Sequence, residues 1–220
     1  MFTGIVASVG TITHLESLGL NAGWRVHVES PMLGLSDVAV GDSIAIQGAC
    51  MTVVSRSASG FDFDVSRESL ARTVGLDVKG PVNLEKAMRL TDRVGGHLVS
   101  GHVDGVGTVV RFEPIAESWL LDIKAPLSLA RYLVFKGSVT VNGVSLTVNQ
   151  VTDVPDGCVI SINLIPHTLA ATTLKALVPG AGVNLEVDMI ARYLDRMRAV
   201  DAAAGNLAAA TGHLPSGPGA

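Results

Sequence analysis

Two short stretches of this sequence place a nucleophilic side chain at matched positions. Cys50 lies in Gly48-Ala-Cys-Met-Thr-Val, and Ser145 lies in Gly143-Val-Ser-Leu-Thr-Val. Thiolate is by far the better nucleophile near pH 7, so two sites of one shape could bind the same ligand and treat it differently. A buried cysteine is by itself more often a small core residue than a nucleophile. The matched context makes Cys50 and Ser145 candidates for chemistry.

Five further polar residues could contact a ligand, and each has a simpler explanation. His102 follows a glycine at an expected strand start, where backbone can approach a ligand, although a lone histidine is more often structural. His97, in a Gly-Gly-His junction, is expected to have a structural role in a turn. Lys136 could anchor an anionic or carbonyl group, but its residue type favours the surface. Ser69 and Thr168 lie at expected helix starts, where capping explains them.

The two stretches belong to a repeat that spans most of the chain, with matches 95 to 101 positions apart. A period this long indicates tandem domains rather than a solenoid, and each half is large enough for its own core. Other matched pairs are Thr3-Gly-Ile-Val with Ser100-Gly-His-Val, Trp24-Arg-Val-His-Val with Trp119-Leu-Leu-Asp-Ile, and Val82-Asn-Leu-Glu with Val183-Asn-Leu-Glu.

Each half is predicted to contain six short strands and one short helix. The strand candidates are rich in Val, Ile, Thr and Phe and are separated by Gly, Asn, Asp and Ser. Closure removes exposed edges, so we expect a mainly β fold of two tandem six-stranded antiparallel barrels. The expected strands are 2–9, 24–29, 43–47, 49–54, 60–65 and 82–86, then 101–110, 119–124, 138–142, 144–151, 158–163 and 183–187, with helices at 68–74 and 168–174.

The pattern changes after the second half. Residues 189–200 place Ile190, Tyr193, Leu194 and Met197 on one face of an expected helix. A short helix needs apolar surface to pack on, and docking onto its own barrel and self-association are both open. Residues 201–220 are rich in Ala and Gly without periodicity, so we expect a disordered tail. The expected divisions are 1–97, 98–188, 189–200 and 201–220.

Composition narrows the classes of partner. A net charge of −4 argues against a phosphate backbone, and nine aromatic residues are too few for base-stacking platforms, so no nucleic acid is expected. Charged residues interrupt every apolar run, so no membrane span is expected. No basic segment precedes an apolar one at the start, and the cytoplasm is the expected location. Cys50 and Cys158 have no metal-type spacing and are expected to be free thiols.

Together the motifs resemble the riboflavin synthase family. The resemblance rests on the opening MFTGIV, the junction GGHLVSGHVDGVG, the GACMTV and NGVSLTV pair, and INLIPHTLAATTL. It covers nearly all of residues 1–200, and several motifs must occur in one order at two sets of positions. The resemblance implies two Greek-key barrels that each bind one lumazine, followed by a C-terminal helix.

The resemblance also implies an activity and partners. Two molecules of 6,7-dimethyl-8-ribityllumazine would react by four-carbon transfer to give riboflavin and 5-amino-6-ribitylaminouracil. No cofactor and no metal would be needed, because the pteridine ring itself acidifies the C7 methyl group. Family members are expected to be homotrimers with the C-terminal helix as the contact, and lumazine synthase is a further partner that the family suggests. Each reacting pair would stack between the first barrel of one subunit and the second barrel of a neighbour.

Carried over by position, the catalytic residues are expected to be Cys50, His102 and Ser145. The Cys50 or Ser145 side chain, or a water that it holds, would add to or stabilise C7 of one lumazine, while His102 moves protons at the methyl group. In the first barrel the expected substrate-binding residues are Gly4, Ile5, Val6, Met51, Thr52, Asp64, Val65, Ser66, Arg67, Glu68 and Ser69. In the second barrel they are Gly101, Val103, Lys136, Leu146, Thr147, Asn163, Leu164, Ile165, Pro166, His167 and Thr168.

Two departures and two rival interpretations remain. Asn142 stands where many relatives carry Asp, and an amide cannot exchange a proton near neutral pH, which argues against a base there. His167 stands where other members can have Glu.

One rival is a non-catalytic lumazine- or flavin-binding protein of the same fold, but such proteins tend to degrade the second site, which is intact here. The other is a purely structural pair of barrels.

Overall fold

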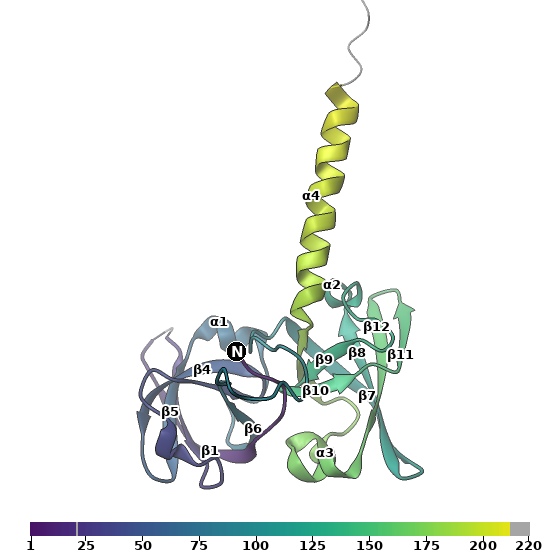
Figure 1. Cartoon of the computed structure of the whole chain (residues 1–220). Helices are drawn as coiled ribbons and strands as arrows, with labels where there is room; N and C mark the ends of the chain where they lie inside the picture. The colour runs from purple at the N-terminus through teal and green to yellow at the C-terminus, as the bar shows by residue number, and fades with distance from the viewer. Residues whose placement is uncertain (21, 212–220) are drawn as a thin grey trace, which may run out of the picture. The chain divides into compact units, whose positions relative to one another are not determined.

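The computed structural model describes residues 1–20 and 22–211 of the chain. Residues Met1–Asp188 form one compact unit that holds both halves of the repeat, and a second unit begins at Met189. Antiparallel strands dominate the first unit, which confirms the expected mainly β class (Figure 1).

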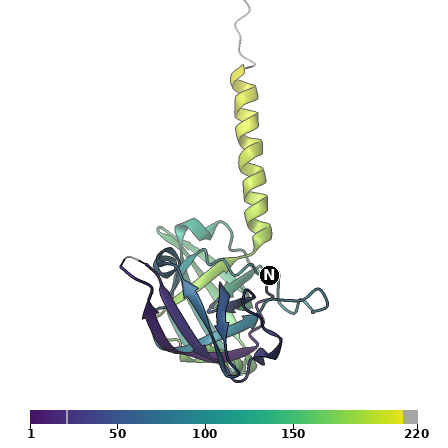
Figure 2. The ribbon, with the colours of Figure 1, turned by 90° about the vertical axis from the view of Figure 1, so that its left-hand side faces the viewer.

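The first half folds into a closed barrel of six strands, which faces the viewer in Figure 2. Alternation explains its core: in β5 the side chains of Phe61, Phe63 and Val65 are almost fully buried, while the two aspartates between them face outward. The strand order is β1-β2-β5-β4-β3-β6, and β6 pairs with β1. The strands are β1 (Ser8–Ser17), β2 (Trp24–Glu29), β3 (Ser43–Ile46), β4 (Ala49–Arg56), β5 (Gly60–Val65) and β6 (Gly80–Lys86).

The second half repeats this plan as a curled seven-stranded sheet, so the expected closed six-stranded barrel is corrected here. Its strand order is β10-β9-β13-β7-β8-β12-β11. The counterpart of β4 is divided, because pairing with β9 ends at Thr147 and pairing with β12 begins at Gln150. Between them, Val148 pairs instead with the backbone of Lys136 and Gly137. The strands are β7 (Gly105–Ile115), β8 (Ser118–Pro126), β9 (Ser138–Val141), β10 (Val144–Thr147), β11 (Gln150–Val154), β12 (Gly157–Leu164) and β13 (Gly182–Val187).

Two matched hairpin turns contact each other between the halves. Gln47-Gly48 links β3 to β4, Asn142-Gly143 links β9 to β10, and the four φ angles are 49°, 84°, 50° and 81°. Turns with two positive φ angles match the twist of β-hairpins. A Cβ added to Gly48 would lie 2.7 Å from the Gly143 amide nitrogen. Glycine therefore permits the close approach of the two halves.

Asn142 has a structural role in this contact. Its side chain is buried, and its Oδ1 accepts a hydrogen bond from the Asn184 amide at 2.8 Å. From the first half, Asn83 Nδ2 donates to the Asn142 carbonyl at 2.9 Å. Asn184 Nδ2 in turn donates to the Gln47 carbonyl at 2.9 Å. Buried amides that satisfy backbone groups across the contact join the two halves.

The short helix after β5 and its counterpart after β12 begin differently from expectation. Ser66 caps α1 by accepting a hydrogen bond from the Ser69 amide at 3.0 Å. In α3 the first helical residue is Pro166, whose missing N–H needs no partner there. The expected caps Ser69 and Thr168 therefore lie inside the first turn. The short helices are η1 (Leu35–Asp37), α1 (Arg67–Arg72), α2 (Leu127–Ala130), α3 (Pro166–Ala171) and η2 (Thr173–Ala176).

The first strand of each half starts later than the pattern predicts. β1 begins at Ser8 and β7 begins at Gly105. We call residues 1–7 and 97–104, which precede them, the first and second leading segments. The two segments pair with each other: the Phe2 amide donates to the Val99 carbonyl at 2.8 Å, and the Val99 amide donates to the Phe2 carbonyl at 3.0 Å. This pairing joins the two leading segments directly to each other.

The C-terminal helix α4 (Met189–Thr211) is longer than the expected helix over 189–200. The expected tail over 201–220 is wrong in its first part, because residues 202–210 include six alanines, the best helix former. Residues 212–220 lie outside the described part of the chain. No helix within that described part is long and apolar enough to cross a membrane.

Candidate functional site

The leading segments cross, so each contacts the candidate nucleophile of the other half. The Gly4 carbonyl accepts a hydrogen bond from the Ser145 amide at 2.7 Å. The Gly101 carbonyl accepts one from the Cys50 amide at 2.7 Å. The expected grouping of Gly4 with Cys50 and of Gly101 with Ser145 is therefore reversed.

Core packing shows the same exchange. Val6, from the first leading segment, packs against the apolar core of the second half. Val103, from the second leading segment, packs against the core of the first half. The Phe2 to Val99 pairing holds the two segments antiparallel to each other. We call the resulting sites the Cys50 site and the Ser145 site.

The Cys50 site is an open hollow of about 190 Å³. Cys50 is half-buried on β4, and His102 is exposed on the second leading segment. Glu68 and Arg72 of α1 form an ion pair at 3.0 Å in its wall. The site thus combines a thiol, an imidazole and a pair of opposite charges. The other lining residues are Ala49, Met51, Ser69, Thr73, Gly101 and Val103.

The Ser145 site contains a serine and histidine pair that sequence reasoning missed. Ser145 Oγ lies 2.7 Å from Nδ1 of His97. The His97 amide donates to the Thr3 carbonyl at 3.1 Å, which ties the residue to the first leading segment. At the adjacent Gly96, an added Cβ would lie 2.7 Å from Ser145 Cβ. The only signal for this contact was the two glycines before His97, which allow close backbone approach.

The environment of His97 favours its neutral form. Burial lowers the pKa of His97 below its ordinary value of 6.5, and the carboxylates of Asp188 and Glu186 oppose that shift. Nε2 is buried and has no hydrogen-bond partner among the described residues. With the proton on Nε2, Nδ1 is free to accept the hydroxyl proton of Ser145. The pair has the geometry of a nucleophile and its base.

Several other predicted site residues lie at these two centres: Gly4 contacts Ser145, and Met51, Glu68, Ser69, Gly101 and Val103 line the Cys50 hollow. Some of the predicted side chains point elsewhere. Met51, Val65 and Leu164 are buried in the barrel cores, so only their backbone can face a ligand. Asp64 is bound to Arg25 at 2.8 Å on the barrel surface. The exposed members are Ile5, Thr52, Ser66, Arg67, Thr147, Asn163, Ile165, Pro166 and His167, while Leu146 and Thr168 are half-buried.

Lys136 lies on the surface, as its residue type favours. Its backbone φ is 62°, and Nζ donates to Asn149 Oδ1 at 2.9 Å. The ammonium group also lies 5.4 Å from the centre of the aromatic ring of Phe135. Within residues 1–20 and 22–211, no group of three or more His, Cys, Asp or Glu residues is placed to hold a metal ion.

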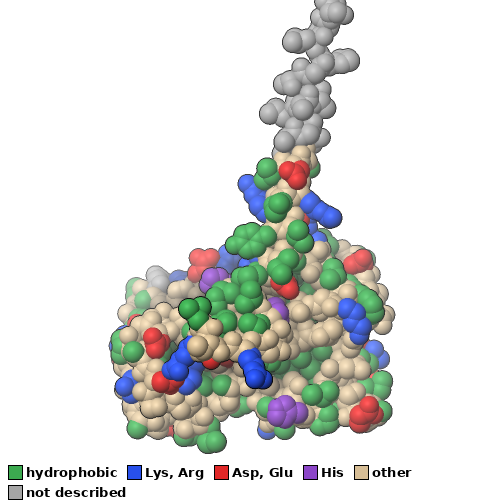
Figure 3. Space-filling model, viewed as in Figure 1, with side chains coloured by type: hydrophobic (Ala, Val, Ile, Leu, Met, Phe, Trp, Pro, Cys, Tyr) green, Lys and Arg blue, Asp and Glu red, His purple; other side chains and the backbone are tan. Residues whose placement is uncertain are grey.

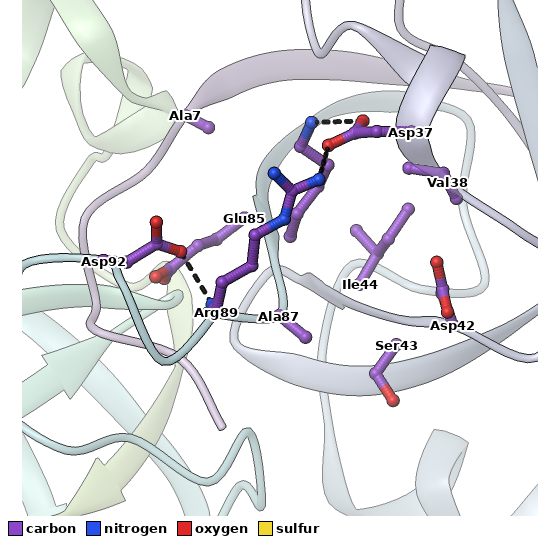
Figure 4. A pocket seen from close by; sticks show the side chains of 11 residues that line it. Ala7, Asp37, Val38, Asp42, Ser43, Ile44, Glu85, Ala87, Arg89 and Asp92 are labelled. Atoms are coloured by element: carbon purple, nitrogen blue, oxygen red, sulfur yellow. Dashed lines mark hydrogen bonds and ion pairs between the residues drawn. The ribbon is translucent and has the colours of Figure 1, made fainter.

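A larger hollow of about 550 Å³ lies elsewhere on the first half (Figure 4). Three of its charged side chains bind one another: Asp37 accepts from Lys86 Nζ at 2.8 Å and from Arg89 Nη2 at 2.7 Å. The bond from Lys86 lowers the pKa of Asp37. None of the predicted site residues lines this hollow. We therefore do not place the site there.

Comparison with known proteins agrees with the duplicated site. The family model described as the lumazine binding domain matches residues 3–87 and 100–188, once in each half. The chain is 45% identical over 203 residues to the riboflavin synthase of Photobacterium phosphoreum, covering 91% of this chain and 90% of that protein. This chain belongs to the riboflavin synthase family.

Solved structures share the fold of this riboflavin synthase family member. LumP complexed with riboflavin superimposes with a TM-score of 0.75 at 27% identity, over 85% of this chain and 99% of LumP. LumP complexed with 6,7-dimethyl-8-(1'-D-ribityl) lumazine gives a TM-score of 0.72 at 28% identity, with the same coverage. Sequence similarity is thus higher to a riboflavin synthase than to LumP.

Proposed function

We propose that this chain is a riboflavin synthase. It converts two molecules of 6,7-dimethyl-8-ribityllumazine into riboflavin and 5-amino-6-ribitylaminouracil by transfer of a four-carbon unit. The observation that carries the proposal is the pair of matched but unlike sites, with Cys50 near the His102 segment in one and Ser145 bonded to His97 in the other. A protein that only binds one chromophore has no use for a second intact site.

The two sites have different roles in the reaction. In the Ser145 site, Ser145 Oγ or a water that it holds adds to C7 of a lumazine, while His97 takes the proton of that hydroxyl or water. In the Cys50 site, Cys50 is the residue equivalent to Ser145, and His102 moves protons at the C7 methyl. The carbanion formed there is stabilised by the substrate's own ring, so no cofactor enters. Holding two lumazines face to face can supply up to ~7–11 kcal/mol of the rate acceleration.

A second chain completes each reacting pair. The hollow at Cys50, about 190 Å³, is smaller than the range of roughly 300–1,000 Å³ typical of pockets that enclose a drug-sized ligand. A lumazine with its ribityl chain would leave one face uncovered there. We infer that the Ser145 site of a neighbouring subunit covers it, within a homotrimer.

The described part of α4 offers the contact for that trimer. Its apolar side chains are exposed along one face, and Figure 3 shows hydrophobic side chains along the helix. Changing Tyr193 and Met197 together to glutamate is expected to convert the trimer into monomers and to abolish turnover, because charges oppose burial of this face. Sedimentation velocity checks this, with Arg196→Glu as the control that keeps the trimer. A trimeric double variant would overturn the assignment.

Turnover separates the enzyme from its rival. Purified chain mixed with 6,7-dimethyl-8-ribityllumazine is expected to form riboflavin, which is followed by its visible absorbance. The expected stoichiometry is one riboflavin for two lumazines consumed. Tight lumazine binding without any riboflavin would select the non-catalytic binding protein instead.

We also propose a cytoplasmic location and lumazine synthase as a partner, since its product is the substrate here.

A further inference from the structure

Two buried carboxylates have no role in the chemistry proposed above. Glu85 on β6 is 8% exposed, and Glu186 on β13 is 2% exposed. They are the last residues of the repeated Val-Asn-Leu-Glu motif, so they occupy the same place in the two halves. Burying a carboxylate is unfavourable unless hydrogen bonds compensate it. Both side chains must therefore be held by donors in the surrounding structure.

Each carboxylate binds one leading segment through three hydrogen bonds. Glu85 accepts from the Thr3 amide at 2.7 Å, from Thr3 Oγ1 at 2.7 Å and from the Gly4 amide at 3.0 Å. Glu186 accepts from the Ser100 amide at 2.7 Å, from Ser100 Oγ at 2.6 Å and from the Gly101 amide at 2.9 Å. Hydrogen bonds to a charged acceptor are the strong ones, so both segments are firmly held.

The glutamates bind the same residues that contact Ser145 and Cys50. Gly4 and Gly101 have φ angles of 75° and 78°, and their carbonyls accept from the Ser145 and Cys50 amides. The Thr3 carbonyl also accepts from the His97 amide. Holding Thr3 therefore places His97 beside Ser145, and holding Gly101 places the next residue, His102, at the Cys50 site.

We propose that the two glutamates are positioning residues that act crosswise: Glu85 of the first barrel organises the Ser145 site, and Glu186 of the second half organises the Cys50 site. Neither glutamate touches the substrate. Each acts through the leading segment that it binds. The proposal builds on the proposed function, but it concerns the geometry of the sites and can be tested without turnover.

Thiol reactivity gives the test for the Cys50 site. Glu186→Gln keeps the side chain's shape but replaces one acceptor oxygen with a donor group, which opposes the amides of Ser100 and Gly101. Loosening this segment exposes Cys50, so its alkylation by iodoacetamide is expected to accelerate by about tenfold, since reactivity follows access. Glu85→Gln is the matched control and is expected to leave that rate within about twofold. Peptide mass spectrometry separates Cys50 from buried Cys158.

The Ser145 site needs a thiol reporter of its own. In a chain carrying Cys50→Ser and Ser145→Cys, Glu85→Gln is expected to accelerate alkylation at position 145, and Glu186→Gln is not. This reversal is the signature of crosswise positioning, because general loss of stability would expose both thiols in both variants. Equal acceleration at both positions, or none at either, would overturn the proposal.

Milder variants guard against loss of folding. A glutamine variant that does not show the native circular dichroism spectrum is replaced by Thr3→Ala or Ser100→Ala. Each of these changes removes one of the three hydrogen bonds to Glu85 or Glu186. They are expected to give the same crossed labelling pattern at smaller amplitude. In the wild-type background both changes should lower kcat more than they raise KM. A crossed labelling pattern in the variants, together with no riboflavin formation by the wild-type chain, would leave this proposal standing and refute the proposed function.

Discussion

Replacing His97 with glutamine lowers kcat by an expected factor of about 10²–10⁴, the usual contribution of a positioned base. The reason is the 2.7 Å contact between His97 Nδ1 and Ser145 Oγ, which glutamine can imitate as a hydrogen bond but not as a proton acceptor. Lumazine binding should change little, so KM is expected to stay within a few-fold. Steady-state kinetics measures both constants. His14→Gln, on β1 outside the site, is the control and should keep the wild-type rate.

The pH dependence of stability provides a second readout for His97. Burial lowers its pKa below 6.5, so the unfolded chain binds a proton at this residue at higher pH than the folded chain does. As the pH falls through 6.5, the free energy of unfolding therefore decreases, and the decrease ends below the folded pKa. Urea unfolding at about pH 7.5 and about pH 5.5 should show a smaller decrease in His97→Gln than in the wild type. An equal decrease in both proteins would contradict a buried neutral His97.

Gly101→Ala is also expected to lower turnover strongly. Gly101 has a φ of 78°, and an added Cβ would lie 2.7 Å from Cys50 Cβ and 2.9 Å from Phe2 Cε2. Strain from a positive φ costs roughly 1–2 kcal/mol, and overpacking adds typically about 1–3 kcal/mol. The second leading segment must then move away from Cys50. A displacement of about 1 Å in a reacting site can lower the rate by about 100-fold.

Gly34 provides the matched control for this change. Its φ is 69°, and an added Cβ would meet nothing within 4 Å. Gly34→Ala thus carries the backbone strain without the collision, and we expect a loss of about 1–2 kcal/mol in stability with turnover unchanged. Urea unfolding and steady-state kinetics on both variants measure the difference. If the two variants behaved alike, the close contact between Gly101 and Cys50 would have no bearing on catalysis.

Much of the fold could be predicted because its pattern is local. Alternation in Phe61-Asp-Phe-Asp-Val marks a strand with one buried face, and β5 has that face. The division of the strand after Thr147 could not be predicted, because the matching stretch of the first half forms the undivided strand β4. The added length of α4 follows from its alanines, which favour a helix. This stretch has no apolar stripe, so hydrophobic periodicity alone does not indicate the helix.

The sequence predicts candidate residues for the site but not their contacts. Matching the halves pairs Cys50 with Ser145, and the structure places the first near His102 and the second in contact with His97. The Gly-Gly-His pattern predicts a turn residue at His97. Its contact with Ser145 could not be predicted, because the two residues lie 48 positions apart in the sequence. The role of Glu85 and Glu186 was likewise hidden, since a carboxylate in a strand is expected on the surface until its burial is known.

The sequence by itself therefore determined that this protein is a duplication, that each half is a small β structure, and that a cysteine and a serine occupy equivalent places in the two. Only the tertiary structure decided which leading segment contacts Cys50 and which contacts Ser145. The physical reason is that the segments look alike, and their crossed packing rests on contacts between residues far apart in the chain, such as Gly4 with Ser145. Local propensity carries no information on a choice between two equivalent partners at that distance.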